Sequence, residues 1–107
     1  MLFHVTMTHT PENCPAYQRE RMPEVIASFE KLEALGKEIN VKTHFFLWAA
    51  PDHVAYALLE ADSLASIARY VNSVAIRQDF RITPVEHLQD TIALGRAMME
   101  RWAQQPK

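Results

Sequence analysis

The sequence predicts one α+β domain with the element order β-α-β-β-α-β, followed by an additional C-terminal helix. Three observations support this prediction. The 107 residues suffice for one hydrophobic core, so we expect a single domain over residues 1–107. The composition, with 49% hydrophobic and 22% charged residues, is typical of a folded globular chain. Segments in which apolar and polar residues alternate are separated by longer segments whose apolar residues recur at helical spacing.

The first third of the chain predicts a strand, an irregular segment and a helix. Apolar and polar side chains alternate in residues 2–9, which indicates a half-buried strand. Two prolines interrupt regular structure in residues 10–15. A helix with an apolar stripe is predicted from Ala16 onward. Pro23 should kink this helix or open its second half, and Gly36 should cap its C-terminal end.

The middle of the chain predicts a β-hairpin. Residues 41–49 and 53–60 are rich in aromatic and β-branched side chains, which favour strands. The segment Ala50-Pro51-Asp52 between them is typical of a tight turn, because proline presets the first turn dihedral. Asp62 or Ser63 should then cap the next helix.

The last third predicts a helix, a short strand and a further helix. The first of these helices should bury a narrow stripe made of Leu64, Ile67, Ala68 and Val71. Residues 81–86 form a short strand, and Pro84 places it at a sheet edge or at a strand end. A final helix is predicted over residues 89–103.

This element order is the ferredoxin-like split βαβ arrangement. Two right-handed crossovers give it an antiparallel four-stranded sheet with the order 4-1-3-2 and helices on one face. The other face should carry side chains too apolar to remain in water, so we expect a homodimer. We also expect the first and third strands to run parallel, with the second and fourth opposed to them.

Two short motifs resemble a known family. The segment Ala-Leu-Leu-Glu-Ala-Asp at residues 57–62 ends the third strand, and Asp-Phe-Arg-Ile-Thr-Pro-Val at residues 79–85 includes the fourth. Together they resemble an uncharacterised domain family of the dimeric α/β-barrel superfamily, although the glycine-rich hairpin of that family is absent at residues 50–53. The resemblance implies a ferredoxin-like fold and a dimeric barrel. It implies no activity, because that of the family is not established, and the wider superfamily includes cofactor-free monooxygenases, haem-degrading enzymes, lactone isomerases and nickel-binding proteins.

Charge and composition exclude several classes of partner. Eleven basic and thirteen acidic residues give a net charge of -2, without a Lys/Arg cluster, so we expect no nucleic-acid partner. The apolar runs are too short to span a membrane, and no secretory leader is visible, so we expect a cytoplasmic protein. One cysteine excludes an intramolecular disulfide and a multi-cysteine zinc finger.

A metal site is predicted at one end of the sheet. The expected strand directions gather there the side chains of His9, Cys14, His44, Glu60, Asp62 and Arg81. The other end would hold His4, Trp48, His53 and His87. Imidazole and thiolate ligands suit Cu, Ni or Zn, so we predict His9 and Cys14 as ligands, with His44 or Glu60 as the third.

Two alternatives remain for His9 and Cys14. In the first, Cys14 is a small buried apolar residue and His9 forms a hydrogen bond at the end of a strand. In the second, Cys14 is a redox-active thiol at the start of a helix, where the helix dipole would favour the thiolate.

Other side chains are candidates for a catalytic base and for a ligand cavity. If its face of the first strand lines the interior of a dimeric barrel, His4 is a candidate general base; the alternative is a histidine hydrogen-bonded within the dimer interface. His44 has the parity of Phe46 and Trp48, which would place it on the open face. An apolar cavity could be lined by Tyr17, Phe46, Trp48 and Tyr56, which are otherwise ordinary core residues.

The sequence therefore predicts a small homodimeric barrel protein that binds a transition metal or a small ligand at a rim of histidine and cysteine. Oxidoreductase chemistry of the monooxygenase type is one option among the activities of the superfamily that the chain resembles, and His4, His9 and Cys14 are then the catalytic candidates. The alternative is a non-catalytic module that binds a ligand or serves only in dimerisation.

Overall fold

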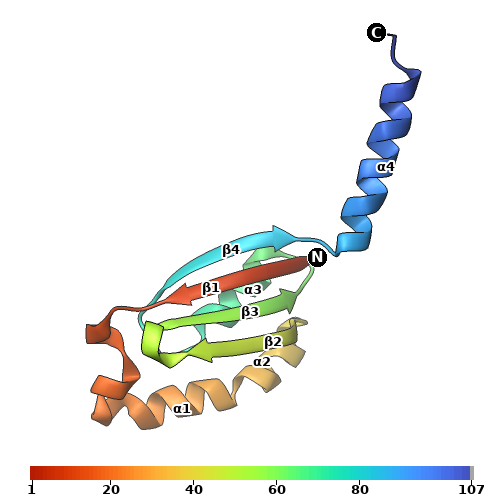
Figure 1. Cartoon of the computed structure of the whole chain (residues 1–107). Helices are drawn as coiled ribbons and strands as arrows, with labels where there is room; N and C mark the ends of the chain where they lie inside the picture. Colours follow the sequence, from red (N-terminus) through yellow and green to blue (C-terminus); the bar gives the residue numbers. More distant parts are fainter. Residues whose placement is uncertain (107) are drawn as a thin grey trace.

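The computed structural model of the chain describes residues 1–106 and contains one four-stranded sheet and four α-helices (Figure 1). The elements in chain order are β1 (Leu2–Thr8), α1 (Met22–Glu30), α2 (Leu32–Ile39), β2 (Lys42–Ala49), β3 (Val54–Glu60), α3 (Leu64–Asn72), β4 (Asp79–Val85) and α4 (Leu88–Gln104).

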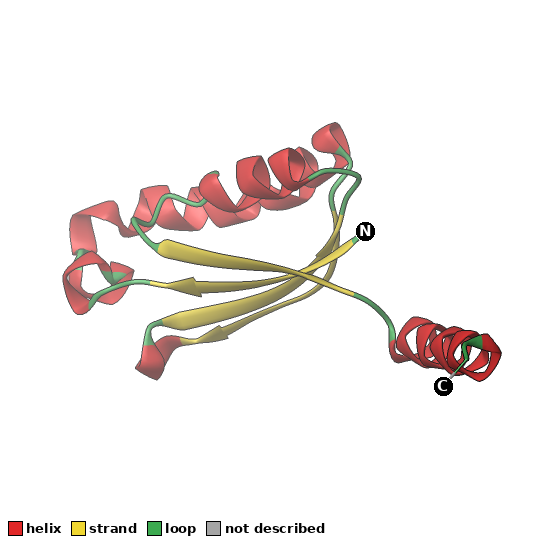
Figure 2. Ribbon diagram, turned by 90° about the horizontal axis from the view of Figure 1, so that it is seen from above, coloured by secondary structure: helices red, strands yellow, loops and turns green. Residues whose placement is uncertain are grey.

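The sheet has the strand order β2-β3-β1-β4, and every neighbouring pair is antiparallel. The predicted ferredoxin-like arrangement is confirmed. Helices α1, α2 and α3 lie on one face of the sheet (Figure 2). Strand β4 lies at an edge, where its Pro84 pairs with Phe3, as the proline predicted.

The predicted direction of the third strand was wrong. Strands β1 and β3 run antiparallel, with Thr8 opposite Val54 and Leu2 opposite Glu60. The reason is topological: the crossover through α1 and α2 makes β1 and β2 parallel, and the hairpin then reverses β3 against both. The end of β1 therefore meets the start of β3.

The first helical region differs from the prediction at both ends. Residues 11–13, 15–17 and 19–21 form 3-10 turns, and α1 begins only at Met22, with Pro23 in its first turn. Gly36 is not a C-terminal cap. It lies inside α2, where a Cβ atom would stand 2.8 Å from the Val41 carbonyl oxygen. Asn40, with a φ of 59°, ends the helix in its place.

The hydrophobic core lies between the sheet and its three covering helices. Val5 and Met7 of β1 and Leu59 of β3 are completely buried, as the alternation of their strands predicted. On α3, the Ser63 side chain accepts a hydrogen bond from the Ser66 backbone N–H at 3.2 Å and so caps the helix.

The buried stripe of α3 differs from the prediction at two positions. Ile67 and Val71 are buried, as expected, but Leu64 is 56% exposed and Ala68 is only half-buried. Tyr70 is buried instead and its hydroxyl lies 2.8 Å from Thr43 Oγ1.

A bulge at the start of β2 changes which side chains face the helices. The register between β2 and β3 shifts between Thr43 and Phe45, so His44 has no partner in the ladder of the described residues. Beyond the shift, Phe46 and Trp48 point to the helix side, and Phe45 to the open face. The prediction that His44, Phe46 and Trp48 share one face of the sheet was therefore wrong.

Helix α4 projects away from the rest of the domain (Figures 1 and 2). Within residues 1–106, none of its side chains is buried, and large apolar ones are 41–70% exposed. These are Leu88, Ile92, Leu94, Met98, Met99 and Trp102. No helix of the described residues is both long enough and apolar enough to cross a membrane.

Candidate functional site

Three potential metal ligands meet where β1 ends and β3 begins. The antiparallel register brings His9 beside His53, and the His9 backbone N–H donates to the His53 carbonyl oxygen at 3.1 Å. A 3-10 turn delivers Cys14, whose N–H donates to the Pro11 carbonyl oxygen at 3.2 Å. One side-chain ligand atom from each of His9, Cys14 and His53 lies within 4.8 Å of the other two.

The turn between β2 and β3 holds His53 in an uncommon backbone conformation. His53 has φ 56° and ψ 40°, in the left-handed region, and its N–H donates to the Ala50 carbonyl oxygen at 3.2 Å. A non-glycine residue in this region carries strain, which surrounding structure must sustain and which often occurs at functional sites. The result is an imidazole directed at His9 from the opposite strand.

Of the two imidazoles in the cluster, that of His9 is the more enclosed. Its side chain is 8% exposed, and its ring stacks on Trp48 with 5.8 Å between ring centroids. His9 Nε2 lies 3.3 Å from His53 Nδ1. Burial, and secondarily the nearby charge of His53, lowers the pKa of His9 below its ordinary value of 6.5. A neutral imidazole, the form that binds metals, is therefore favoured at neutral pH.

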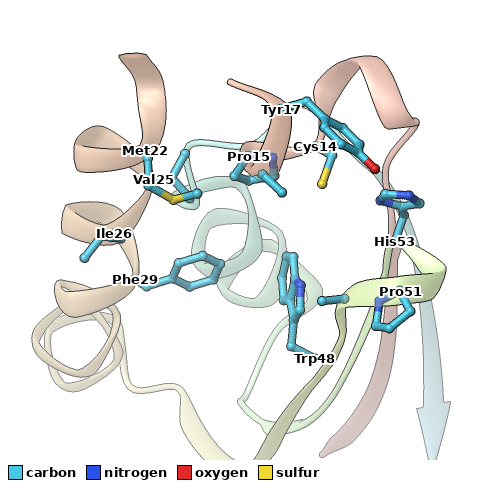
Figure 3. Close-up of a pocket in the computed structure, with 12 residues that line it drawn as sticks. Cys14, Pro15, Tyr17, Met22, Val25, Ile26, Phe29, Trp48, Pro51 and His53 are labelled. Carbon is cyan, nitrogen blue, oxygen red and sulfur yellow. The ribbon is translucent and has the colours of Figure 1, made fainter. Parts of the chain in front are cut away.

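An apolar cavity of about 410 Å³ adjoins this cluster. Figure 3 shows Cys14, Tyr17 and His53 along one side of it, with the side chains of α1 opposite and Trp48 between them. The α1 side chains are Met22, Val25, Ile26 and Phe29. A small apolar molecule in this cavity would contact two of the three potential ligands.

A second, polar cavity of about 310 Å³ lies beside His9. Its lining residues are Thr8, His9, Thr10, Asn13, Arg77, Gln78 and Asp79. Three buried atoms here, His9 Nδ1 and both polar side-chain atoms of Gln78, have no hydrogen-bond partner among residues 1–106. Since buried polar groups are nearly always paired, this cavity is suited to ordered water.

The sequence of residues 1–99 matches the model of a family described as a domain of unknown function, DUF3303. The chain belongs to this family. The resemblance to an uncharacterised ferredoxin-like domain family is confirmed.

Two further comparisons concern curated proteins and solved structures. No curated protein matches the DUF3303 chain. A crystal structure described as a dimeric ferredoxin-like protein from an uncultured marine organism is similar to it at 17% sequence identity and a TM-score of 0.34. That match covers 81% of this chain and 96% of the other.

The predicted third ligands lie elsewhere in the DUF3303 chain. His44 Nε2 is 2.9 Å from Glu60 Oε1, at the opposite end of the sheet from His9 and Cys14. The hydrogen bond from His44 lowers the pKa of Glu60 below its ordinary value. His44 and Glu60 thus form a pair of their own.

The predicted cavity residues are divided among three places. Tyr17 and Trp48 line the apolar cavity beside the cluster. Phe46 packs edge-on against Phe29, with 6.3 Å between ring centroids, and lines a different hollow. Tyr56 lies on the open face of the sheet, where its ring centroid is 6.2 Å from that of His4.

Sequence reasoning missed His53 because it reversed the third strand. The available signal was the hairpin itself: a strand that returns antiparallel to β1 must start beside the residue that follows β1. Cys14 also differs from expectation, because it precedes a three-residue 3-10 turn, Pro15–Tyr17, and no α-helix. The helix-dipole argument for a redox-active thiol therefore does not apply.

Proposed function

We propose that the chain binds one transition metal ion through His9, Cys14 and His53, beside a cavity that receives a small apolar ligand. The observation that supports this most is the separation of the ligand atoms, all within 4.8 Å of one another, with 3.3 Å between the two imidazole nitrogens. Tetrahedral coordination with ordinary zinc bond lengths places ligand atoms about 3.3–3.6 Å apart. Small side-chain rotations therefore suffice to close the site.

The donor set favours particular metals. Two imidazoles and one thiolate suit Cu or Zn, and Ni is the third candidate. Three protein ligands leave one coordination position for water or a ligand, as in catalytic rather than structural sites. Cys14 and His53 line the apolar cavity, so that position would open toward it.

The cavity favours a small, mostly apolar ligand, for instance one aromatic ring with a single polar atom. Its volume of about 410 Å³ lies in the range of small-molecule sites, and Tyr17, Phe29 and Trp48 supply aromatic surface. With a redox-active metal such as copper, the site would support oxidation of the bound ligand only together with an external electron acceptor such as dioxygen, which takes up the electrons. With zinc it supports polarisation of the ligand without electron transfer.

A homodimer is the second part of the proposal. Both the open face of the sheet and α4 present apolar side chains: Leu47 and Tyr56 are 60% and 39% exposed, and Trp102 of α4 is 59% exposed. Apolar surface of this extent on one small domain is typical of an interface between proteins. A second copy carries the complementary helix and face, so a two-fold symmetric pair buries both.

Metal analysis of the protein, purified without a histidine tag, tests the site. We expect about one equivalent of Zn or Cu per chain, lost in Cys14→Ser and in His53→Ala. The matched control is His44→Ala, which removes a histidine from the other end of the sheet and should retain the metal. Co²⁺ loading should produce a thiolate-to-metal absorption band that Cys14→Ser abolishes.

Two results would overturn this proposal. One is a wild-type protein that takes up none of Zn²⁺, Cu²⁺, Ni²⁺ or Co²⁺. The other is equal loss of metal in His53→Ala and His44→Ala. Either result would leave the cluster as a buried cysteine beside two hydrogen-bonded histidines.

A further inference from the structure

Three buried polar atoms of residues that line the polar cavity beside His9 have no hydrogen-bond partner among the described residues. His9 Nδ1 and the amide nitrogen and oxygen of Gln78 are all buried, and none has a partner among the described residues. Both residues line the same cavity of about 310 Å³. Leaving such groups unpaired costs stability, so a water in the cavity is expected to join them.

The position of the other ring nitrogen of His9 indicates that Nδ1 is the atom that donates a hydrogen bond. Nε2 faces the cluster, 3.3 Å from His53 Nδ1, and it is the atom available to bind the metal. The proton of a neutral ring then resides on Nδ1, which is buried without a partner among the described residues and requires an acceptor. Metal-binding histidines nearly always donate their second N–H to a carboxylate, a carbonyl or water, which fixes the orientation of the ring.

We propose that Gln78 is the positioning residue of His9. After a small rotation of its side chain, the Gln78 oxygen accepts the hydrogen bond that His9 Nδ1–H donates, either directly or through one ordered water of the adjoining cavity. This holds the Nδ1–H tautomer and presents Nε2 to the metal. The inference rests on the proposed metal site, but its hydrogen-bonding part exists in the metal-free protein as well.

Other members of the cavity are less suited to this role. Asn13 donates its side-chain N–H to Thr10 Oγ1 at 3.1 Å, but this pair is exposed, so its oxygen atoms are open to solvent and are not buried beside His9. Arg77 offers only donors and cannot accept from His9. Asp79 is an acceptor, but it is exposed at the first position of β4 and its carboxylate is solvated. Gln78 is the one lining residue whose buried amide is unpaired among residues 1–106.

The affinity test compares three variants by competition for Co²⁺ and Zn²⁺. Gln78→Leu keeps the approximate volume and removes the acceptor, so metal affinity should fall roughly 10–100-fold. Gln78→Glu restores an acceptor and should return affinity to within about threefold of the wild type. Gln89→Leu, the same substitution on exposed α4, is the matched control and should change nothing.

The tautomer test uses the metal-free protein. Nitrogen-15 NMR of the histidine rings should show His9 as the Nδ1–H tautomer in the wild type and in Gln78→Glu. A mixture of tautomers, or the Nε2–H form, is expected in Gln78→Leu. Melting curves identify any variant that fails to fold, and Gln78→Asn then replaces it as a variant whose shorter amide should also weaken the effect.

The outcomes separate the two proposals. If the wild type binds no metal, the proposed function fails, and the tautomer measurement still decides whether Gln78 orients His9. If the wild type binds metal but Gln78→Leu keeps full affinity and an unchanged tautomer, the role of Gln78 is refuted. Equal losses in Gln78→Leu and Gln78→Glu would refute it too, because they would indicate packing only.

Discussion

Gly36 shows how a single residue sets the path of the chain between α2 and β2. A Cβ at this position would stand 2.8 Å from the Val41 carbonyl oxygen, and backbone atoms cannot move aside cheaply. Gly36→Ala should therefore destabilise the domain by about 1–3 kcal/mol despite the better helix propensity of alanine. Urea unfolding measures this. The other glycine, Gly95, has open space around its Cβ position, and Gly95→Ala should cause no such loss.

The pairing of Glu60 with His44 predicts a pH dependence of stability. The hydrogen bond from His44 lowers the pKa of Glu60 in the folded state from the ordinary 4.5. Ionised Glu60 therefore adds stability above that value, and this contribution is lost as the pH falls through the lowered pKa.

Denaturant midpoints measured between about pH 6 and pH 3 test this pairing. The decline in stability should be shallower in Glu60→Gln and also in His44→Ala, which removes the donor. Identical pH profiles for these variants and the wild type would contradict the pairing. The effect is small, because the pair lies at the surface.

Within the site, His9 and Cys14 could be predicted from the sequence, but the residues that accompany them in the structure could not. His9 and Cys14 were predicted together because a short proline-containing loop joins them, and the structure places them in one cluster. His53 was assigned to the wrong end, since that depends on strand direction, a long-range property. The role proposed for Gln78 had no signal in the sequence, because it follows from which buried atoms are unpaired among residues 1–106.

At the scale of elements, α3 tests how the helix layer holds the sheet. Ile67 is completely buried, whereas Leu64, one turn earlier on the same helix, is 56% exposed. Ile67→Asp should cost roughly 3–5 kcal/mol, because it buries a carboxylate in the core. Leu64→Asp should cost little. Thermal melting of the two variants makes the comparison, and equal melting temperatures would show that this face of α3 is not packed as described.

The strands and helices themselves were largely predictable, because each has a local pattern. Alternation identified β1, the turn at residues 50–52 identified the hairpin, and helical spacing identified α3 and α4. Two features were not predictable from such patterns. The bulge at His44 shifts the register by one residue, and Gly36 lies inside α2 against the Val41 carbonyl oxygen, while Asn40 takes the expected capping position.

At the scale of the whole molecule, the proposed homodimer makes α4 a shared element. Ile92 and Met99 are 45% and 64% exposed, so replacing both with glutamate leaves the core of one chain intact. Sedimentation of the wild type at low micromolar concentration should give twice the mass of one chain, since a standard interface buries about 1,600 Å². The double glutamate variant should sediment as a single chain. A wild type that sediments as one chain would contradict the dimer.

Because Trp48 stacks on His9, its intrinsic fluorescence should report on metal binding at the cluster. The chain has two tryptophans, and they lie in separate places: Trp48 beside the histidine cluster and Trp102 on α4, 59% exposed. In the Trp102→Phe variant, Trp48 is the single tryptophan, and a bound paramagnetic ion such as Cu²⁺ should quench its emission. In the Trp48→Phe variant, Trp102 is the single tryptophan. Dilution should shift its emission to longer wavelength, because dissociation of the dimer exposes α4 to solvent. Occupancy of the site and assembly of the chains can therefore be followed separately, each in its own single-tryptophan variant and without an added label.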